Sequence, residues 1–399
     1  MKLNRRNFLK ASGGIALSAA SYRRVWGANS RVGMALIGTG RRGREVMKSM
    51  LQTGNVDLHV LCDIWDVQRQ RAKEELGIKK AFDTFSLEET LARKEVDAVL
   101  IATPDHLHKN YALEVLKNGR HLYLEKPATL YFEEGEALKK AVSESGKICQ
   151  TGTQQRSGSL YKRVKEEFFS GSKILGDIVF VRAVWSDFGW QRRKIEPRPK
   201  PDNFQWERFL GPAQEVPYEW TRYDAWRNYK EYGAGILSDL LTHWVDVAQW
   251  MMDDANPLNA VTSGGIYYLK DGRTNPDTVN SLIQYKNGWN FTFECSVMPV
   301  RNERQSVLFH GTKGKLELFR EGYIHTPHGE KPVFVENKYD LNLEHVNNFF
   351  DAVKNNKQPS ANIDVGLQAV KPSHLAVAAY WSGQRMKFDE QQENIVSAL

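Results

Sequence analysis

The feature that most constrains this chain is a glycine-rich turn that directly follows a short apolar run. Val32 to Ile37 reads as a buried parallel strand, and it leads into Gly38-Thr39-Gly40-Arg41-Arg42-Gly43. A helical segment and a second apolar run, 56–62, come next, and that run ends at Asp63. The order of strand, G-x-G-x-x-G turn, helix, strand and acid predicts a dinucleotide-binding unit.

Each glycine of the turn has a physical role in such a unit. The first, Gly38, permits the tight turn, the second, Gly40, lets the backbone approach a pyrophosphate, and the third, Gly43, allows close helix packing. The following helix presents free N–H groups to the phosphates. The predicted cofactor contacts of the turn are Gly38, Thr39, Gly40, Arg41, Arg42 and Gly43.

The acid at the end of the second strand bears on which dinucleotide binds. Asp63 is placed to accept a hydrogen bond from a ribose 2′-hydroxyl, and its carboxylate would repel a 2′-phosphate. An arginine near this position can instead host that phosphate, and Arg41 and Arg42 are both close in sequence. The sequence therefore favours NAD and leaves NADP open.

Apolar runs and helical segments continue to alternate as far as residue 151. The run 98–102 leads into Thr103-Pro104-Asp105-His106-Leu107-His108, and the run 121–124 leads into Glu125-Lys126-Pro127. This alternation predicts a doubly wound parallel sheet, whose ligands bind beyond the carboxyl ends of the strands. The further predicted contacts at these ends are Thr103, Pro104, His108, Glu125 and Lys126.

The length of the chain requires a second domain. Its 399 residues exceed the roughly 250–300 residues at which a single hydrophobic core stops growing. Turn signals such as Asn287-Gly288 separate strand-like runs and fit hairpins; the runs are 178–185, 260–268, 279–285, 289–295, 306–309 and 315–318. The fold class is therefore α/β, with a Rossmann domain at 31–151 and an α+β domain at 152–399 built on a large, mostly antiparallel open sheet. Two late helical stretches, 343–353 and 365–380, are expected to pack between the domains.

The N-terminus has the layout of a cleavable export signal. Asn4-Arg5-Arg6-Asn7-Phe8-Leu9-Lys10 precedes a short apolar stretch, 11–20, that is too short to span a bilayer. The paired arginines predict twin-arginine export of the chain, with residues 1–30 as the signal peptide. No later segment is apolar enough to be a membrane span.

The net charge of +7 belongs mostly to this leader, because residues 1–31 hold seven basic residues and no acidic one. A body close to neutrality gives no support for a nucleic-acid partner. The three cysteines, Cys62, Cys149 and Cys295, have no paired spacing. Buried thiols are therefore expected, rather than disulfides or a metal site.

The motifs together resemble the Gfo/Idh/MocA family of sugar and cyclitol oxidoreductases, in its twin-arginine-exported subgroup. They are the G-x-G-x-x-G turn, Thr103-Pro104-x-x-x-His108-x-x-x-Ala112, and Glu125-Lys126-Pro127, which is the most specific. The chain also matches the Asp and the His of the family pattern G-G-x-x-x-D-x-x-x-H, at Asp239 and His243, with Ala234 where a second glycine is common.

The four-residue spacing of Asp239 and His243 in a helical run predicts that they share a helix face. The resemblance implies that Lys126, Asp239 and His243 are catalytic. Residues 186–232 are rich in aromatic side chains, which suit the apolar faces of sugar rings. The predicted substrate contacts are Arg156, Trp226 and Arg227.

These observations predict an exported, periplasmic NAD(P)-dependent oxidoreductase that acts on a carbohydrate or cyclitol with a tightly bound cofactor. One alternative is an NAD-dependent glycoside hydrolase that oxidises its substrate transiently. Glycoside hydrolases of the family carry Tyr before the key His, so Asp239 favours simple dehydrogenation. A second alternative is a non-catalytic sugar- or cofactor-binding protein. The resemblance also implies a homodimer or homotetramer, paired through the open face of the second sheet.

Overall fold

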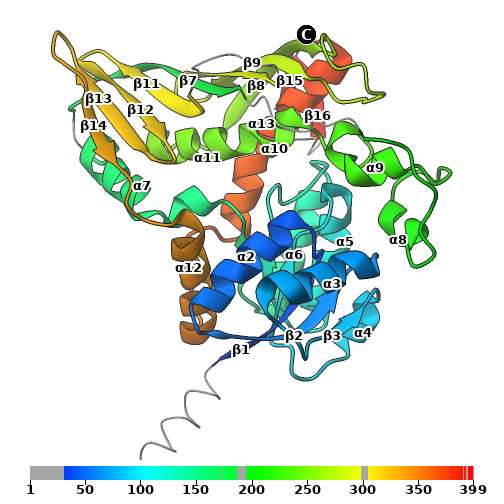
Figure 1. The fold of residues 1–399 in the computed structure, drawn as a ribbon. Helices are drawn as coiled ribbons and strands as arrows, with labels where there is room; N and C mark the ends of the chain where they lie inside the picture. The colour runs from blue at the N-terminus through cyan, green and yellow to red at the C-terminus, as the bar shows by residue number, and fades with distance from the viewer. Residues whose placement is uncertain are drawn as a thin grey trace, which may run out of the picture.

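The computed structural model describes residues 31–171, 173–186, 195–297, 304–389, 391 and 394–398. The predicted export signal, 1–30, lies outside the described residues. Figure 1 shows two layered units, one above the other, with a long helix, α13 (Ile363–Ser382), running between them. Within the described residues, no helix is both long and apolar enough to cross a bilayer.

The first unit is built on a six-stranded parallel sheet in the order β3-β2-β1-β4-β5-β6. Its strands are β1 (Val32–Ile37), β2 (Val56–Cys62), β3 (Phe82–Thr84), β4 (Ala98–Ile101), β5 (His121–Leu124) and β6 (Cys149–Thr151). Its helices are α2 (Arg41–Gln52), α3 (Asp66–Leu76), α4 (Leu87–Leu91), α5 (His108–Lys117) and α6 (Glu134–Ser145). This is the predicted doubly wound sheet, and the strand order reverses between β1 and β4, where such sheets bind ligands.

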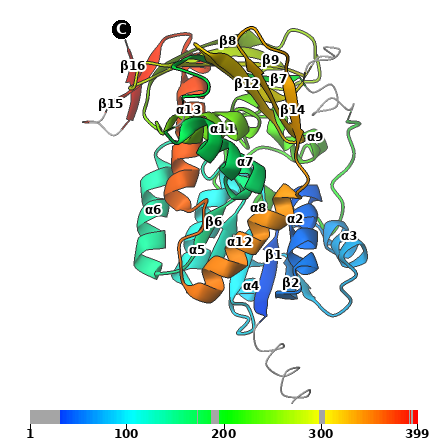
Figure 2. The same ribbon diagram turned by 90° about the vertical axis from the view of Figure 1, so that its left-hand side faces the viewer.

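Helices cover both faces of this sheet, which explains why β1 is apolar throughout. Met34 and Leu36 pack under α2, α3 and α12 (Leu341–Asn355), while Ala35 and Ile37 pack under α4, α5 and α6. The helix α12 comes from the far end of the chain and lies against α2 (Figure 2). The cover of the first sheet is therefore completed by residues that are distant in sequence.

The second unit is a ten-stranded sheet in the order β14-β13-β12-β11-β7-β10-β9-β8-β15-β16. Only the β7–β10 pair is parallel. The strands are β7 (Ile178–Ser186), β8 (Pro257–Gly265), β9 (Thr278–Tyr285), β10 (Asn290–Ser296), β11 (Ser306–Gly311), β12 (Gly314–Phe319), β13 (Gly322–Pro327), β14 (Val333–Glu336), β15 (Met386–Asp389) and β16 (Asn394–Ser397). The mostly antiparallel sheet is as predicted. The four outermost strands, β13 to β16, are not among the predicted runs, because short, half-exposed edge strands carry little apolar alternation.

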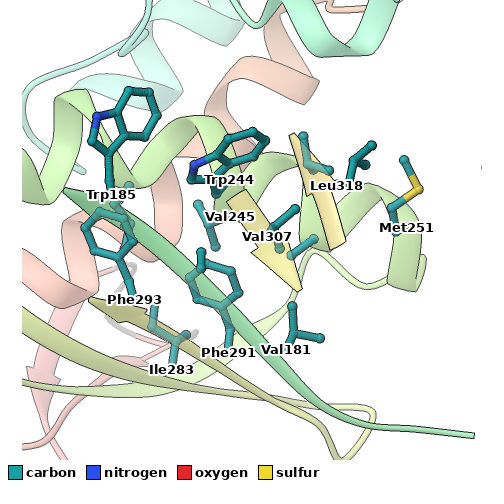
Figure 3. Close-up of a cluster of buried hydrophobic side chains, with 14 of the residues drawn as sticks. Val181, Trp185, Trp244, Val245, Met251, Ile283, Phe291, Phe293, Val307 and Leu318 are labelled. Carbon is teal, nitrogen blue, oxygen red and sulfur yellow. The ribbon is translucent and has the colours of Figure 1, made fainter. Parts of the chain in front are cut away.

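One face of the second sheet is buried by helices. Trp244 and Val245 of α11 (Leu241–Met252) meet Phe291 and Phe293 of β10 in a continuous apolar cluster (Figure 3). The opposite face carries exposed apolar side chains at Val261 and Leu282, which pair across β8 and β9. The sheet is thus covered on one side and open on the other.

The three cysteines, Cys62, Cys149 and Cys295, are free and buried, as the sequence predicts. Burial raises the pKa of the first two thiols to about 12. Both thiols are therefore protonated at neutral pH and behave as small apolar groups.

Candidate active site

The glycine turn after β1 has the geometry that a dinucleotide requires. Gly38 has φ +83°, and a Cβ there would lie 2.6 Å from the carbonyl oxygen of Ala102. A Cβ on Gly43 would lie 2.1 Å from the carbonyl oxygen of Gly38, so helix α2 packs directly on the turn. A Cβ on Gly40, by contrast, meets no heavy atom within 4 Å, and no side chain caps the N-terminus of α2. The turn therefore leaves open space and free N–H groups where a pyrophosphate would bind.

Asp63 is fixed at the end of β2 by the same turn. Its carboxylate accepts hydrogen bonds from the backbone N–H of Thr39 at 2.7 Å, the Thr39 hydroxyl at 3.0 Å and the backbone N–H of Trp65 at 3.1 Å. Burial raises the pKa of Asp63, and these hydrogen bonds lower it in part. An ionised carboxylate offers about four lone-pair sites, so acceptor capacity remains for a ribose hydroxyl. The buried side chain of Thr39 serves to hold Asp63.

The two arginines of the turn differ in position. Arg42 reaches to the end of β5, where its guanidinium lies 2.9 Å from Glu125 Oε1. Because β4 lies between β1 and β5, Arg42 is on the side of the turn away from Asp63. It is therefore not placed to host a 2′-phosphate at Asp63, which strengthens the case for NAD. Arg41 is solvent-exposed beside Glu45.

Lys126, at the end of β5, is held by Asp239 from the second unit. Its Nζ donates to Asp239 Oδ1 and, at 3.0 Å, to the Asp239 backbone carbonyl, while Arg227 Nε donates to Asp239 Oδ2 at 3.1 Å. Burial raises the pKa of Asp239, but the charges of Lys126 and Arg227 outweigh it, so the net pKa lies well below the usual range. Asp239 is therefore a permanent anion that fixes two cations.

His243 lies close to this cluster, but not on the same helix as Asp239. The helix α10 (Ile236–Asp239) ends at Asp239 and α11 begins at Leu241, so the prediction of one continuous helix is wrong. The break leaves the Asp239 carbonyl bonded to Lys126. Spacing alone could not show this, because it depends on a partner from the other unit.

The imidazole of His243 is buried and stacks on the indole of Trp185, with 5.5 Å between ring centroids and 25° between planes. Burial, followed by the charges of Lys126 and Arg320, lowers its pKa well below the usual value. The enclosed Nδ1 has no hydrogen-bond partner among the described residues. At neutral pH the ring is uncharged and able to accept a proton.

Asp105 is a carboxyl group at this site that the sequence analysis did not single out. It is buried at the end of β4, and its Oδ2 would lie 3.0 Å from a Cβ on Gly233. Burial, and then the charge of Asp239, raises the pKa of Asp105 to about 8. It is therefore mostly protonated at neutral pH. Its position at the carboxyl end of a predicted strand was the signal that could have identified it.

Two predicted contacts have structural partners instead. The buried ring of His108 lies 2.7 Å from the Pro127 carbonyl oxygen and 3.2 Å from the Thr103 carbonyl oxygen, so it links the ends of β4 and β5. Arg156 forms a salt bridge with buried Asp246 at 2.8 Å. The geometry favours a positioning role for both residues over the direct cofactor and substrate contacts predicted for them.

The remaining predicted residues lie around the cluster. Thr103 and Pro104 are partly exposed where β4 ends, and buried Glu125 sits against Gly152, whose Cβ would lie 2.8 Å from the carboxyl group. The Arg227 guanidinium lies over the Trp226 ring, 4.1 Å from its centroid. Among the described residues, no group of three His, Cys, Asp or Glu side chains is arranged to hold a metal ion.

Two domain families match this chain. Residues 32–153 match the oxidoreductase family with an NAD-binding Rossmann fold, and residues 171–317 match the GFO/IDH/MocA C-terminal domain. This chain belongs to the Gfo/Idh/MocA family. It is accordingly an NAD-dependent oxidoreductase, and the unit that carries Gly40 and Asp63 is its NAD-binding domain.

Similar members of the Gfo/Idh/MocA family act on polyols and sugars. The chain is 31% identical over 163 residues to scyllo-inositol 2-dehydrogenase (NAD(+)) of Bacillus subtilis, a match that covers 40% of this chain and 46% of that enzyme. It is 22% identical over 369 residues to myo-inositol 2-dehydrogenase of Thermotoga maritima, covering 90% and 98%. The fold is shared with levoglucosan dehydrogenase in complex with NADH and levoglucosan, at TM-score 0.69 and 20% identity over 92% of this chain and 99% of that one.

Proposed function

We propose that this protein is an exported sugar or cyclitol oxidoreductase that retains its nicotinamide cofactor between turnovers. The observation that carries this proposal is the meeting of Lys126, Asp239 and a neutral His243 at the carboxyl end of β5, beside the dinucleotide turn. This set combines a proton acceptor, a cation that can stabilise an alkoxide and an anion that fixes the cation.

The residues divide the oxidation of a carbinol among them. Bound NAD supplies the hydride acceptor for the carbon-bound hydrogen. His243 takes the hydroxyl proton, through Nε2, because Nδ1 is enclosed. Lys126 donates a hydrogen bond to the substrate oxygen and stabilises the negative charge that develops as its proton leaves. The carbon–oxygen bond becomes a carbonyl, and His243 passes the proton on to solvent, because its lowered pKa does not favour the charged ring.

Asp239 acts through Lys126 and not as a base. Its pKa lies far below neutrality, so it cannot hold a proton that the reaction releases. Its two oxygens instead hold Lys126 and Arg227 in fixed positions. The ammonium of Lys126 is thereby oriented before substrate arrives, which removes part of the entropic cost of reaction.

Retention of the cofactor is supported by an aromatic strap, residues 203–224, which contains α8 (Trp206–Leu210) and α9 (Trp220–Asp224) and lies beside the first unit (Figure 1). The backbone N–H of Gln205 donates to the Ile64 carbonyl at 3.1 Å. Trp65 meets three strap rings edge-on, those of Phe204, Trp220 and Tyr223. The strap is thus bonded to the chain immediately after Asp63, at the adenosine end.

A retained cofactor fits the proposed location, because a compartment outside the cytoplasm does not supply a free pool of NAD. The test of location is substitution of both leader arginines, Arg5→Lys with Arg6→Lys, in the full-length chain. We expect the double variant to stay in the cytoplasm while the parent chain is exported. Unchanged export of the double variant would contradict the twin-arginine route.

We also propose that two or more copies pair through the open face of the second sheet. The support is the pair of exposed apolar side chains on that face, Val261 and Leu282, which face each other across β8 and β9. Neighbouring exposed apolar side chains on a sheet face are typical of an interface. Light scattering should give a dimer or tetramer for the parent chain and a smaller species for Val261→Glu with Leu282→Glu.

The decisive experiment follows the reduced-nicotinamide absorbance band of the purified protein before and after addition of sugars, cyclitols and aryl glycosides. We expect bound NAD, and a rise of the band with one class of compound. Release of an aglycone without net reduction would instead establish transient-oxidation glycoside hydrolysis, which a retained cofactor also permits. A protein that binds no nicotinamide would refute the proposal.

A further inference from the structure

Arg320 is a cation of the second unit whose charge acts on the catalytic histidine. It lies in the turn between β12 and β13, where the two strands end at Phe319 and Gly322. Its guanidinium carbon lies over the Trp185 indole, 5.3 Å from the ring centroid, and the same indole stacks on His243. A single aromatic side chain therefore contacts both the catalytic imidazole and the Arg320 guanidinium.

Arg320 differs from the other cations of the site in having no salt bridge. Lys126 and Arg227 share Asp239, and Arg42 pairs with Glu125. Among the described residues, Arg320 has no carboxylate oxygen within 4.0 Å. Burial lowers its pKa, although the side chain stays accessible to solvent. An arginine keeps its charge in proteins, so Arg320 is a solvent-accessible cation that can bind a ligand.

Arg320 stands apart from the other cations of the site by its lack of a carboxylate at salt-bridge distance among the described residues. Lys126 and Arg227 share Asp239, Arg42 lies near Glu125 and Glu45, and the buried carboxyl group of Asp105 is mostly protonated at neutral pH. The cofactor's pyrophosphate has its own donors in the N–H groups of α2, on the first unit. Arg320 lies on the second unit, which leaves its charge for the other ligand of the site, the substrate.

We propose that the substrate is an acidic sugar, a carbohydrate that carries a carboxylate or sulfate group, and that Arg320 binds this group. A planar guanidinium can donate two parallel N–H···O hydrogen bonds to the oxygens of a carboxylate or sulfate. The hydroxyl groups of a neutral sugar are weaker acceptors of such bonds. Buried Trp185 fixes the position of the Arg320 guanidinium relative to His243. The inference rests on the proposed oxidoreductase function, because it names the substrate class of that same site.

The test compares sugars in matched pairs that differ only in the acidic group. The probes are glucose with glucuronate, galactose with galacturonate, and glucose with glucose 6-sulfate, each titrated calorimetrically into the NAD-loaded protein and then assayed by the reduced-nicotinamide band. We expect the acidic sugar of at least one pair to bind about tenfold more tightly than its neutral partner, or more, because a hydrogen bond to a charged group is strong enough to raise the affinity by this factor. Comparison of the glucose 6-sulfate pair with the two uronate pairs shows whether the site prefers a sulfate or a carboxylate.

The variant Arg320→Gln should remove most of this preference, raising KM for the acidic sugar about 10-fold to 100-fold, while the KM for its neutral partner stays within about twofold. Arg304→Gln is the matched control, since Arg304 also lies over an aromatic ring, Phe319, at 4.1 Å, but has Glu317 as a partner at 3.8 Å. It should leave both values unchanged. Arg320→Lys, which keeps the charge and loses the planar fork, should fall between the parent and Arg320→Gln.

The proposal is overturned if no acidic member binds more tightly than its neutral partner, or if Arg320→Gln leaves the preference intact. These failures are distinct from failure of the proposed function. Reduction of bound NAD by neutral sugars alone would leave the oxidoreductase in place and reject only the acidic substrate. Absence of any bound nicotinamide would reject the function itself.

Discussion

Two aspartates, half-buried Asp63 and buried Asp239, mark the two ends of the site and are held by opposite means. Asp63 accepts only neutral hydrogen bonds, from Thr39 and Trp65 of its own domain, and its pKa is raised. Asp239 is held by two cations, Lys126 from the NAD-binding domain and Arg227 from its own, and its pKa is lowered. The adenosine end is therefore a hydrogen-bonding surface made by one domain, whereas the reacting end is a charged cluster assembled from two.

This difference teaches which changes should affect binding and which should affect chemistry. Asp63 can accept hydrogen bonds from the hydroxyl groups of a ribose, and this binding involves no change in the charge of either group. The charged cluster at Asp239 can act on an oxygen whose charge changes during the reaction. Substitutions at the two ends should therefore separate cofactor affinity from turnover.

The largest effect is expected at the reacting end. Lys126→Ala and His243→Ala should each lower turnover by roughly 10²-fold or more, because each removes a group that acts on the reacting oxygen or its proton. Bound NAD, measured after denaturation of the purified protein, should be unchanged. Arg31→Ala, at an exposed ion pair with Asp57, is the control and should keep full activity. Full turnover in both variants would remove the catalytic assignment.

The adenosine end should show the reverse behaviour. Asp63→Asn keeps the shape of the side chain but loses one acceptor oxygen, so we expect NAD affinity to fall about 10-fold to 100-fold. Turnover at saturating NAD should be close to that of the parent. Asp57→Asn, an exposed carboxylate of the same strand, should leave NAD affinity unchanged. Equal loss of turnover and affinity would show that the two ends are not independent.

A smaller effect is expected from the strap. Trp65→Ala removes the ring on which Phe204, Trp220 and Tyr223 meet, so the dissociation rate of NAD should rise about tenfold, as the loss of aromatic contacts worth ~0.5–1.5 kcal/mol each implies. Stopped-flow displacement of NADH fluorescence measures this rate. Trp381→Ala, at an exposed tryptophan of α13, is the control. An unchanged rate in Trp65→Ala would separate the strap from cofactor retention.

The smallest effect concerns pH. The pKa of His243 in the folded protein is lowered below the usual histidine pKa of about 6.5. The ring therefore stays neutral at pH values below about 6.5, and we expect enzyme activity to be lost only as the pH falls through this lowered pKa. Because the charge of Arg320 helps to lower this pKa, Arg320→Gln should move the acidic limb of kcat/KM to higher pH. A limb that stays in place, or moves to lower pH, would show that Arg320 does not act electrostatically on His243.

The sequence was sufficient to predict the fold and the site where the contacts that determine them join residues close together in the chain. Gly38, Gly40 and Gly43 follow one another in a single turn, and Asp63 ends the next strand, so motif and spacing predict both the fold and the adenosine end. The sequence was insufficient where the partner comes from elsewhere. The helix break after Asp239 follows a bond to Lys126, and Arg320 reaches His243 only through the packing of Trp185. The pairing of Arg156 with Asp246 likewise has no local signal.

Because α12 packs on the first sheet but lies near the end of the chain, the NAD-binding domain cannot be completed until α12 has been synthesised. Met34 and Leu36 leave the ribosome early, yet Val346, Phe349 and Phe350, which cover their face of the sheet, are made near the end of synthesis. The His345 ring also lies 2.9 Å from the Thr151 carbonyl oxygen of β6, so this closure is hydrogen-bonded. A nascent or prematurely ended chain therefore has α2 and α3 on this face but not α12, and the apolar surface left exposed can be recognised by chaperones and proteases. Completion of the polypeptide becomes the condition for a closed NAD-binding domain.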